Sequence, residues 1–279
     1  MRVIETIADL RAALPPGEPV CLVPTMGNLH EGHLSLIRAA RARIDGERSG
    51  LVVASIFVNP MQFGPQDDFV KYPRTLRRDC ELLSGGGCDI VFAPGPLEIY
   101  PVAQEYRVQP PTDLADILEG AVRPGFFTGV CTVVLKLFNI VRPNAAVFGK
   151  KDYQQLLIVT NMVRQLNLPI EILAGETVRE DSGLALSSRN GYLDDRQRVE
   201  AAQLQVAIAE ARREAHSGRT DWPAIEQAAI EFLVERGWKP DYVAIRSRSD
   251  LRAPTAGRPM VVLGAARIGD TRLIDNLEI

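Results

Sequence analysis

Two kinds of apolar pattern alternate over the first two-thirds of the chain. Short, nearly continuous apolar runs, typical of strands, occupy residues 20–23, 51–58, 89–92, 145–148 and 170–173. Apolar side chains at helical spacing lie between them, at residues 34–43, 132–141 and 154–166, and three glycines at 85–87 close a further helical segment. Strands that alternate with helices predict an α/β fold with a doubly wound, Rossmann-like parallel sheet.

The pattern changes after about residue 177. Asp194 and Gln197 have the spacing of a capping box, which predicts a long helix from there to His216. A second helix is predicted at residues 223–236, and three strand-like runs follow at 242–245, 260–263 and 271–274. This order predicts two domains: a Rossmann-like domain at residues 1–177 and a smaller α+β lid domain at residues 178–279.

Composition excludes several classes of function. The 279 residues are 46% hydrophobic and 24% charged, with a net charge of −3, which argues against a nucleic-acid partner. No apolar run approaches the ~18 residues of a membrane helix, and the N-terminus lacks a signal peptide's apolar core. None of the four cysteines forms a C-x-x-C pair, and Cys21 and Cys131 lie in apolar surroundings. We interpret the chain as a cytoplasmic protein without a membrane partner.

Two of the three histidines, His30 and His33, lie just after the first long strand. Zinc proteases need the spacing H-E-x-x-H, so the spacing H-x-x-H disfavours a metal site. Two interpretations stay open: a hydrogen-bonded structural pair, or a site for an anion.

The position of the pair favours an anion. Ligands of parallel α/β sheets bind at the carboxyl ends of the strands, where a helix N-terminus offers free N–H groups. Gly32 has no Cβ, so a flat ring such as adenine could lie against its backbone. A bound phosphate would raise the pKa of either imidazole and favour its charged form.

Four sequence blocks carry a family resemblance: "PTMGNLHEGHLSLI" from residue 24, "FVNPMQFGP…D…YPRT" from residue 57, "RPG…GV.TVV.KLFNIV.P..A.FG.KD.QQL" from residue 123 and "DSGLALSSRNGYL" from residue 181. H-x-G-H alone resembles the nucleotidylyltransferase superfamily. The blocks in this order resemble the pantoate–β-alanine ligase family, up to about residue 195.

The resemblance implies that pantoate and β-alanine condense to pantothenate through a pantoyl adenylate, with ATP as a substrate and AMP and pyrophosphate released. It also implies Mg²⁺, held mainly by the phosphates rather than by protein ligands, and a homodimer. The small-molecule partners would be pantoate, β-alanine and ATP.

The family's functional residues can be placed on this sequence. His33 would be the proton donor, with His30 and Lys151 also catalytic. Gln62 and Gln155 would bind pantoate, and Gln62 also β-alanine, because amides hold a carboxylate and a hydroxyl without neutralising the nucleophile. The residues expected to bind ATP are Met26, Gly27, Asn28, Leu29, His30, Glu31, Gly32, His33, Gly149, Lys150, Lys151, Asp152, Val178, Leu186, Ser187, Ser188 and Arg189.

The sequence also departs from the family. Phe126 occupies a position where the family commonly has histidine, and Lys150 one where glutamate is frequent; we expect Lys150 to face solvent. Tyr72 and Asp79 match positions near the substrate lid and the magnesium ion. Alternative functions are adenylyl transfer to another small substrate and a regulatory nucleotide-binding module. A tRNA synthetase is disfavoured because the chain lacks a basic surface.

Overall fold

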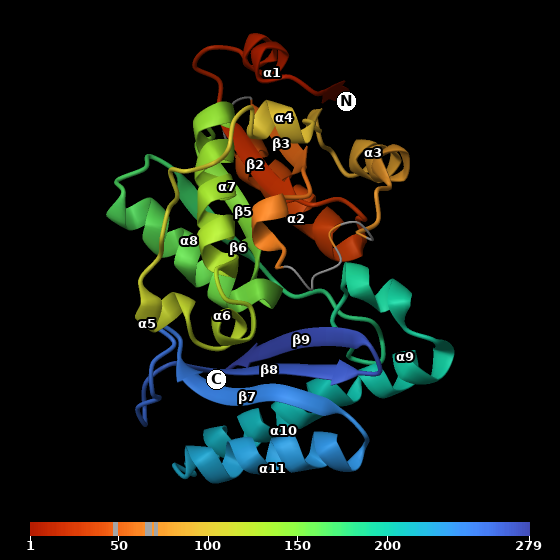
Figure 1. Ribbon diagram of the computed structural model, residues 1–279, viewed down its shortest axis with the longest axis vertical. Coiled ribbons are helices and arrows are strands. Elements are labelled where there is room, and N and C mark those ends of the chain that lie inside the picture. Colours follow the sequence, from red (N-terminus) through yellow and green to blue (C-terminus); the bar gives the residue numbers. More distant parts are fainter. Residues whose placement is uncertain (47–49, 65–68, 70–71) are drawn as a thin grey trace.

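The computed structural model describes residues 1–46, 50–64, 69 and 72–279 and contains two sheets (Figure 1). The first has six parallel strands in the order β1-β4-β3-β2-β5-β6, which confirms the doubly wound α/β prediction. Its strands are β1 (Arg2–Ile4), β2 (Val20–Thr25), β3 (Leu51–Ile56), β4 (Ile90–Phe92), β5 (Ala145–Gly149) and β6 (Glu171–Gly175).

Helices cover both faces of this sheet because alternate strand residues point to opposite sides. Cys21 and Val23 share one buried cluster with apolar residues of α2 (Glu31–Asp45) and α3 (Leu76–Gly85). Val20 and Leu22 share the other cluster with residues of three helices. These are α1 (Ile7–Ala13), α7 (Phe126–Val141) and α8 (Tyr153–Gln165).

Helix α7 is longer than the predicted 132–141 and belongs to the core of its own chain. Eleven of its residues are buried, from Phe127 to Val141. Gly129 lets this helix approach the short helix η1 (Pro60–Gln62), since a Cβ at Gly129 would lie 2.2 Å from the Met61 carbonyl oxygen. The apolar character of α7 is therefore explained by packing within the chain.

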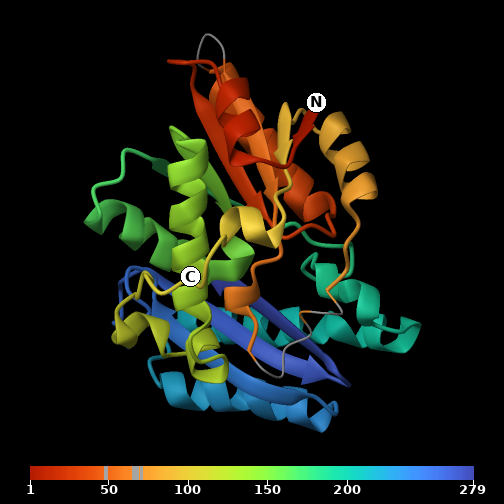
Figure 2. The ribbon, with the colours of Figure 1, turned by 45° about the horizontal axis from the view of Figure 1, so that its top comes forward.

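The second sheet is antiparallel, with β7 (Lys239–Ser247), β8 (Met260–Ile268) and β9 (Thr271–Glu278) in that order. Residues of one face, such as Val243 and Val262, pack on α10 (Gln203–His216) and α11 (Trp222–Glu235). Residues of the other face, such as Ala244 and Val261, join the main core of the first half. Figure 2 shows this sheet between the two helices and the six-stranded sheet.

Several boundaries and elements differ from the sequence predictions. The capping box at Asp194 and Gln197 is confirmed, but the helix it opens, α9 (Asp195–Ala201), ends before α10 begins. The prediction missed β1, α1 and short elements that carry little periodic pattern, namely η1, α4 (Pro96–Ile99), α5 (Thr112–Ala115), α6 (Glu119–Val122), η2 (Lys150–Asp152) and η3 (Ser188–Tyr192). In the described part of the chain, no helix has the length and apolar character needed to span a membrane.

Candidate functional site

A cleft of about 1260 Å³ opens at the carboxyl ends of the parallel strands. The segments that follow β2, β3, β5 and β6 all line it, and so does the C-terminal sheet through residues such as Arg272 and Asn276. Ligands of α/β sheets bind at this edge. The cleft therefore lies where the sequence predicted it.

The turn after β2 is held by a buried carboxylate. Gly27 and Asn28 both have positive φ angles, of 82° and 52°. The fully buried side chain of Asp79, on α3, accepts hydrogen bonds from the backbone N–H groups of Asn28 (3.0 Å) and Leu29 (2.8 Å) and from the Thr75 hydroxyl (3.0 Å). Asp79 thus shapes the turn rather than offering free oxygen atoms to a magnesium ion.

His30 and His33 cap helix α2 reciprocally. The His30 Nδ1 atom accepts a hydrogen bond from the Gly32 N–H group (3.2 Å), and His33 Nδ1 accepts one from the His30 N–H group (3.3 Å). These are the N-cap and N3 positions of a capping box, which explains the spacing of three residues. Because both Nδ1 atoms accept, a neutral ring carries its proton on Nε2. The structural and anion-binding interpretations of the pair are therefore compatible.

Burial favours the uncharged form of both imidazoles at neutral pH. Burial lowers the pKa of His30 to about 3, and the nearby His33 and Lys151 act in the same direction. Burial and Lys151 lower the pKa of His33 to about 4. The rise in pKa expected from the sequence depends on a bound anion; without one, the shift has the opposite sign.

Gly32 is required by the fold of this cap. A Cβ at Gly32 would lie 2.9 Å from the His30 Cε1 atom and 3.0 Å from Nδ1, which is tighter than ordinary Cβ contacts. A side chain at this position would displace the His30 ring. The packing of this ring therefore explains the glycine without reference to adenine.

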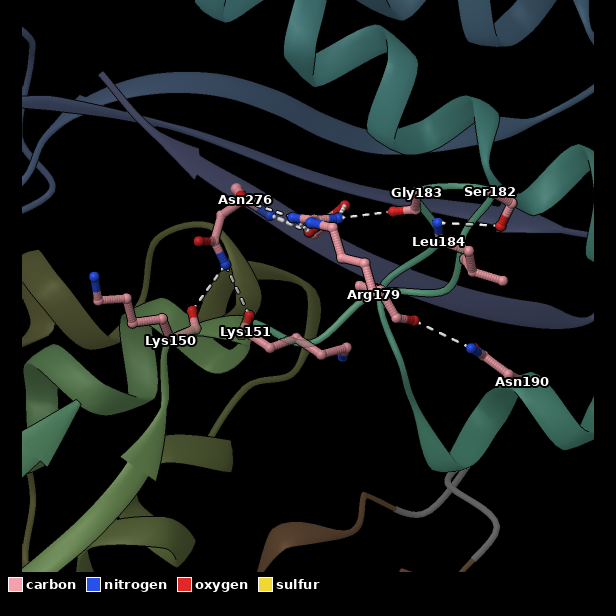
Figure 3. Close-up of polar contacts among 10 residues, drawn as sticks. Lys150, Lys151, Arg179, Ser182, Gly183, Leu184, Asn190 and Asn276 are labelled. Atoms are coloured by element: carbon pink, nitrogen blue, oxygen red, sulfur yellow. Dashed lines mark hydrogen bonds and ion pairs between the residues drawn. The ribbon is translucent and has the colours of Figure 1, made fainter. Parts of the chain in front are cut away.

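The two lysines after β5 point in opposite directions (Figure 3). Lys150 donates to Glu176 (2.5 Å) and Glu278 (3.2 Å), and its side chain is 20% exposed, so the expectation that it faces solvent is wrong. Lys151 lines the cleft and lies close enough to lower the pKa of both histidines.

The segment after β6 reaches the turn after β2. The Ser188 hydroxyl donates to the Asn28 carbonyl oxygen (3.0 Å), and the Asn28 amide donates to the Ser188 carbonyl oxygen (3.4 Å). Ser187, Ser188 and Arg189 all line the cleft. Two segments 160 residues apart in sequence are thus joined at the cleft.

The two predicted glutamines line the same cleft. The Gln62 Oε1 atom accepts a hydrogen bond from the buried Asn59 amide (2.9 Å), which leaves the Gln62 NH₂ group as a donor. Gln154, next to Gln155, instead donates to the carbonyl oxygens of Leu114 (2.7 Å) and Ile117 (2.9 Å) and is 3% exposed. Both members of this adjacent pair line the cleft, but the amide of Gln154 is already used within the chain, and binding of a ligand by Gln155 stays a prediction.

Phe126 supports an arginine. The Arg123 guanidinium carbon lies 3.8 Å from the centre of the Phe126 ring, within cation–π distance. Arg123 also donates to the Gln62 carbonyl oxygen (2.9 Å). An aromatic ring at position 126 can therefore support the loop that carries Gln62.

Most of the predicted site residues line the cleft, and five do not. Leu29 is 2% exposed in the core, and Glu31 pairs with Arg38. The Gly27 N–H group donates to the Thr25 hydroxyl (3.3 Å), and Asn28 and Lys150 make the contacts given above. The lining residues are Met26, His30, Gly32, His33, Gln62, Gly149, Lys151, Asp152, Gln155, Val178, Leu186, Ser187, Ser188 and Arg189. Positions 65–68 and 70–71 of the second sequence block lie outside the described residues.

The C-terminal sheet contributes to the cleft, which the sequence did not predict. Tyr242, Thr271, Arg272, Asp275 and Asn276 all line it. Their only sequence signal was a polar residue within an otherwise apolar strand pattern. Among the described residues, no group of three or more His, Cys, Asp or Glu side chains could hold a metal ion.

Comparisons with known proteins agree on one family. Residues 2–278 match the family described as pantoate-beta-alanine ligase. The chain is 55% identical over 287 residues to a pantothenate synthetase of Leptothrix cholodnii, and the match covers 100% of both proteins.

Two solved structures share the fold. Pantothenate synthetase from Thermus thermophilus has a TM-score of 0.90 and 47% identity, over 99% of each chain. Pantoate-beta-alanine ligase from Francisella tularensis, complexed with beta-gamma ATP and beta-alanine, has a TM-score of 0.76 and 32% identity, over 99% of this chain and 97% of the other. Since the family match and the identity both extend along nearly the whole sequence, this chain belongs to the pantoate–β-alanine ligase family.

Proposed function

We propose that this protein condenses pantoate with β-alanine at the expense of ATP, through a pantoyl adenylate, and releases AMP and pyrophosphate. The observation that carries the proposal is the arrangement of the cleft. Donors from three separate segments, around His33, Lys151 and Ser188, meet at the carboxyl edge of the sheet, and two glutamines line the same cleft.

The first step activates the pantoate carboxylate. One of its oxygen atoms attacks the α-phosphorus of ATP, and the bond from that phosphorus to the pyrophosphate oxygen breaks. Negative charge develops on the phosphoryl oxygens, where fixed donors stabilise the transition state. In this proposal Lys151 and Arg189 supply positive charge, and the hydroxyls of Ser187 and Ser188 supply hydrogen bonds.

The histidines act in this proposal as neutral donors when the nucleotide arrives. With both Nδ1 atoms accepting backbone protons, the Nε2–H groups are left for the phosphates. Charge from a bound triphosphate then favours protonation of the rings. The remaining expected ATP contacts, including Met26, Gly149, Asp152, Val178 and Leu186, stay predictions.

The second step forms the amide. The β-alanine nitrogen attacks the acyl carbon, the bond from that carbon to the AMP oxygen breaks, and the nitrogen loses a proton. Gln62 and Gln155 would hold pantoate by hydrogen bonds to its hydroxyl and carboxylate groups, and Gln62 would also contact β-alanine. Because the side-chain Oε1 atom of Gln62 accepts a hydrogen bond from the Asn59 amide, the Gln62 NH₂ group is oriented as a donor.

A magnesium ion fits this site only if the phosphates hold it. No described group of acidic or histidine side chains forms a cage, and the oxygen atoms of Asp79 already accept three hydrogen bonds. Bound there, Mg²⁺ would neutralise part of the phosphate charge. We further propose a cytoplasmic homodimer whose residues 178–279 act as a lid domain.

Product analysis tests the proposal. AMP and pyrophosphate should appear only with pantoate present, and mass spectrometry should detect pantoyl adenylate when β-alanine is withheld. ADP and phosphate as products would exclude the ligase mechanism. Turnover with a phosphate-bearing acceptor instead of pantoate would favour the adenylyltransferase alternative.

A further inference from the structure

Strand β9 carries two buried polar side chains, Asp275 and Asn276, that were not among the predicted site residues. Asp275 is 4% exposed and Asn276 is 6% exposed, and both line the cleft. Buried polar groups are retained where their hydrogen bonds are satisfied. The partners of these two residues are the segments that carry the candidate phosphate-binding groups.

Asn276 holds the segment that carries Lys151. The Asn276 amide nitrogen donates to the carbonyl oxygens of Lys150 and Lys151, both at 2.9 Å (Figure 3). Both protons of one amide are thus used on consecutive peptide groups. The short helix η2 that contains these residues has no side-chain cap of its own. Asn276 therefore fixes the orientation of this turn, and with it the origin of the Lys151 side chain.

Asp275 holds the hairpin that leads to the Ser-Ser-Arg segment. Its two oxygen atoms accept two hydrogen bonds from the Arg179 guanidinium, at 2.6 and 2.8 Å. Arg179 also donates to the Gly183 carbonyl oxygen (3.0 Å), across a hairpin closed by a bridge between Arg179 and Ala185 (Figure 3). The hairpin ends directly before Ser187 and Arg189.

The two contacts are coupled within β9. The Asp275 Oδ1 atom accepts a hydrogen bond from the Asn276 backbone N–H group (2.8 Å), and Arg179 donates to the Asn276 carbonyl oxygen (3.3 Å). Lys151 is 28 residues before Arg179 in sequence, and β9 contacts the segments of both residues. Asp275 and Asn276 of β9, together with Arg179, therefore link the two segments through hydrogen bonds.

We propose that Asp275 and Asn276 are positioning residues that set the distance between Lys151 and the Ser187–Arg189 segment, residues 187–189, and so preorganise the site for a nucleoside triphosphate. The proposal rests on the proposed function only in the identity of the nucleotide. A displacement of about 1 Å in such a site can cost a 10²-fold change in rate, so small shifts of η2 are sufficient to matter.

The test uses Asn276→Leu, which keeps the approximate volume and removes both donors. Binding of a non-hydrolysable ATP analogue and of pantoate is measured separately by calorimetry on the full-length protein. We expect the Kd for the analogue to rise roughly 10-fold or more and the Kd for pantoate to stay within about twofold. Asn276→Asp, which keeps the shape but lacks the donors, should weaken analogue binding in the same direction.

Leu277→Ala is the matched control, because Leu277 lies on the same strand and packs into the core of the second half. This control should lower the melting temperature and leave the Kd for the analogue unchanged. The proposal is overturned if folded Asn276→Leu or Asn276→Asp binds the analogue as the wild type does, or if Leu277→Ala weakens binding equally. Failure of the ligase proposal is separate, since it would show as wild-type protein without pantoate-dependent AMP.

Discussion

The orientation and tautomer of the His30 and His33 rings are set by the backbone N–H groups that donate hydrogen bonds to them. Each Nδ1 atom serves the helix cap, so the acidic proton and the free edge of each ring are at Nε2. Burial lowers the pKa of both rings and so favours their uncharged form. At the scale of a residue, the site therefore begins as a pair of neutral donors beside one ammonium group.

The low pKa of His30 makes stability depend on pH. Since the unfolded chain takes up a proton near pH 6.5 and the folded His30 near 3, folding is favoured above pH 6.5 and is weakened as the pH falls toward 3. His30→Asn keeps a residue that caps helices well but does not titrate. We expect its free energy of unfolding to fall less steeply between pH 6.5 and 4 than that of the wild type, measured by urea denaturation.

His216→Asn, which removes a histidine outside the cleft, is the control. Equal slopes for His30→Asn and the wild type would show that His30 is not held neutral by the fold.

At the scale of elements, the loops after the strands are shaped by neighbours distant in sequence. Asp79 lies about 50 residues after the turn that follows β2, and it accepts hydrogen bonds from the N–H groups of that turn. Hydrogen bonds to a charged group contribute about 1.5–3 kcal/mol each. Asp79→Asn replaces one of the two accepting oxygen atoms by an NH₂ group, which can only donate. We predict that this change lowers the free energy of unfolding by roughly 2–3 kcal/mol and, because the turn lies beside the cleft, raises KM for ATP.

Denaturation and steady-state kinetics measure these two effects. Glu81→Gln, on the same helix but exposed, should change neither quantity. A stable Asp79→Asn protein with normal ATP kinetics would mean that the turn is held by other contacts.

The first turn of α7 gives a second prediction. Phe126 supports Arg123, which holds the Gln62 loop, and an exposed cation–π contact is worth about 0.5–1 kcal/mol. Phe126→Ala should raise KM for pantoate by about twofold to fivefold, whereas Phe126→His, which restores a ring, should remain close to the wild type. Equal increases for both variants, in a pantoate titration at saturating ATP, would exclude the aromatic support.

At the scale of the whole molecule, a buried ion pair joins the two halves. The Arg272 guanidinium, on β9, donates to both oxygen atoms of Glu119 at 2.8 and 2.6 Å and to Asp241 at 2.6 Å. Burial alone would raise the pKa of Glu119, but the hydrogen bonds and charge of Arg272 outweigh it and lower the pKa. The pair therefore contributes stability above the unfolded pKa of about 4.5 and loses it as the pH falls.

Removal of one partner from a buried pair costs about 3–5 kcal/mol, because the remaining charge has no compensation. We predict a loss of this size for Arg272→Met at pH 7, and a smaller difference from the wild type below pH 4. The control is Arg213→Met, which removes one partner of the exposed ion pair between Arg213 and Glu210 and should change the free energy of unfolding little. Loss below about 1 kcal/mol at pH 7 would show that this contact does not link the halves energetically.

How much the sequence could predict follows from the range of the interactions. The continuous apolar run at residues 51–58 predicted a strand, and β3 (Leu51–Ile56) forms there, with Val52, Val53 and Ala54 fully buried. This prediction succeeds because a run of apolar residues is visible within a short stretch of sequence. The different roles of Lys150 and Lys151 were not predictable, since they depend on Glu278 and Asn276. The division into domains at residue 177 stays a prediction.

The central claim is that the Nε2 edges of His30 and His33, the ammonium of Lys151 and the guanidinium of Arg189 surround one triphosphate. A crystal structure with a non-hydrolysable ATP analogue and pantoate would show whether they do. We expect phosphate oxygens within hydrogen-bond distance of all four side chains, with the pantoate carboxylate beside the α-phosphorus and Gln62. Phosphates bound elsewhere, with these four groups in contact only with solvent, would contradict it.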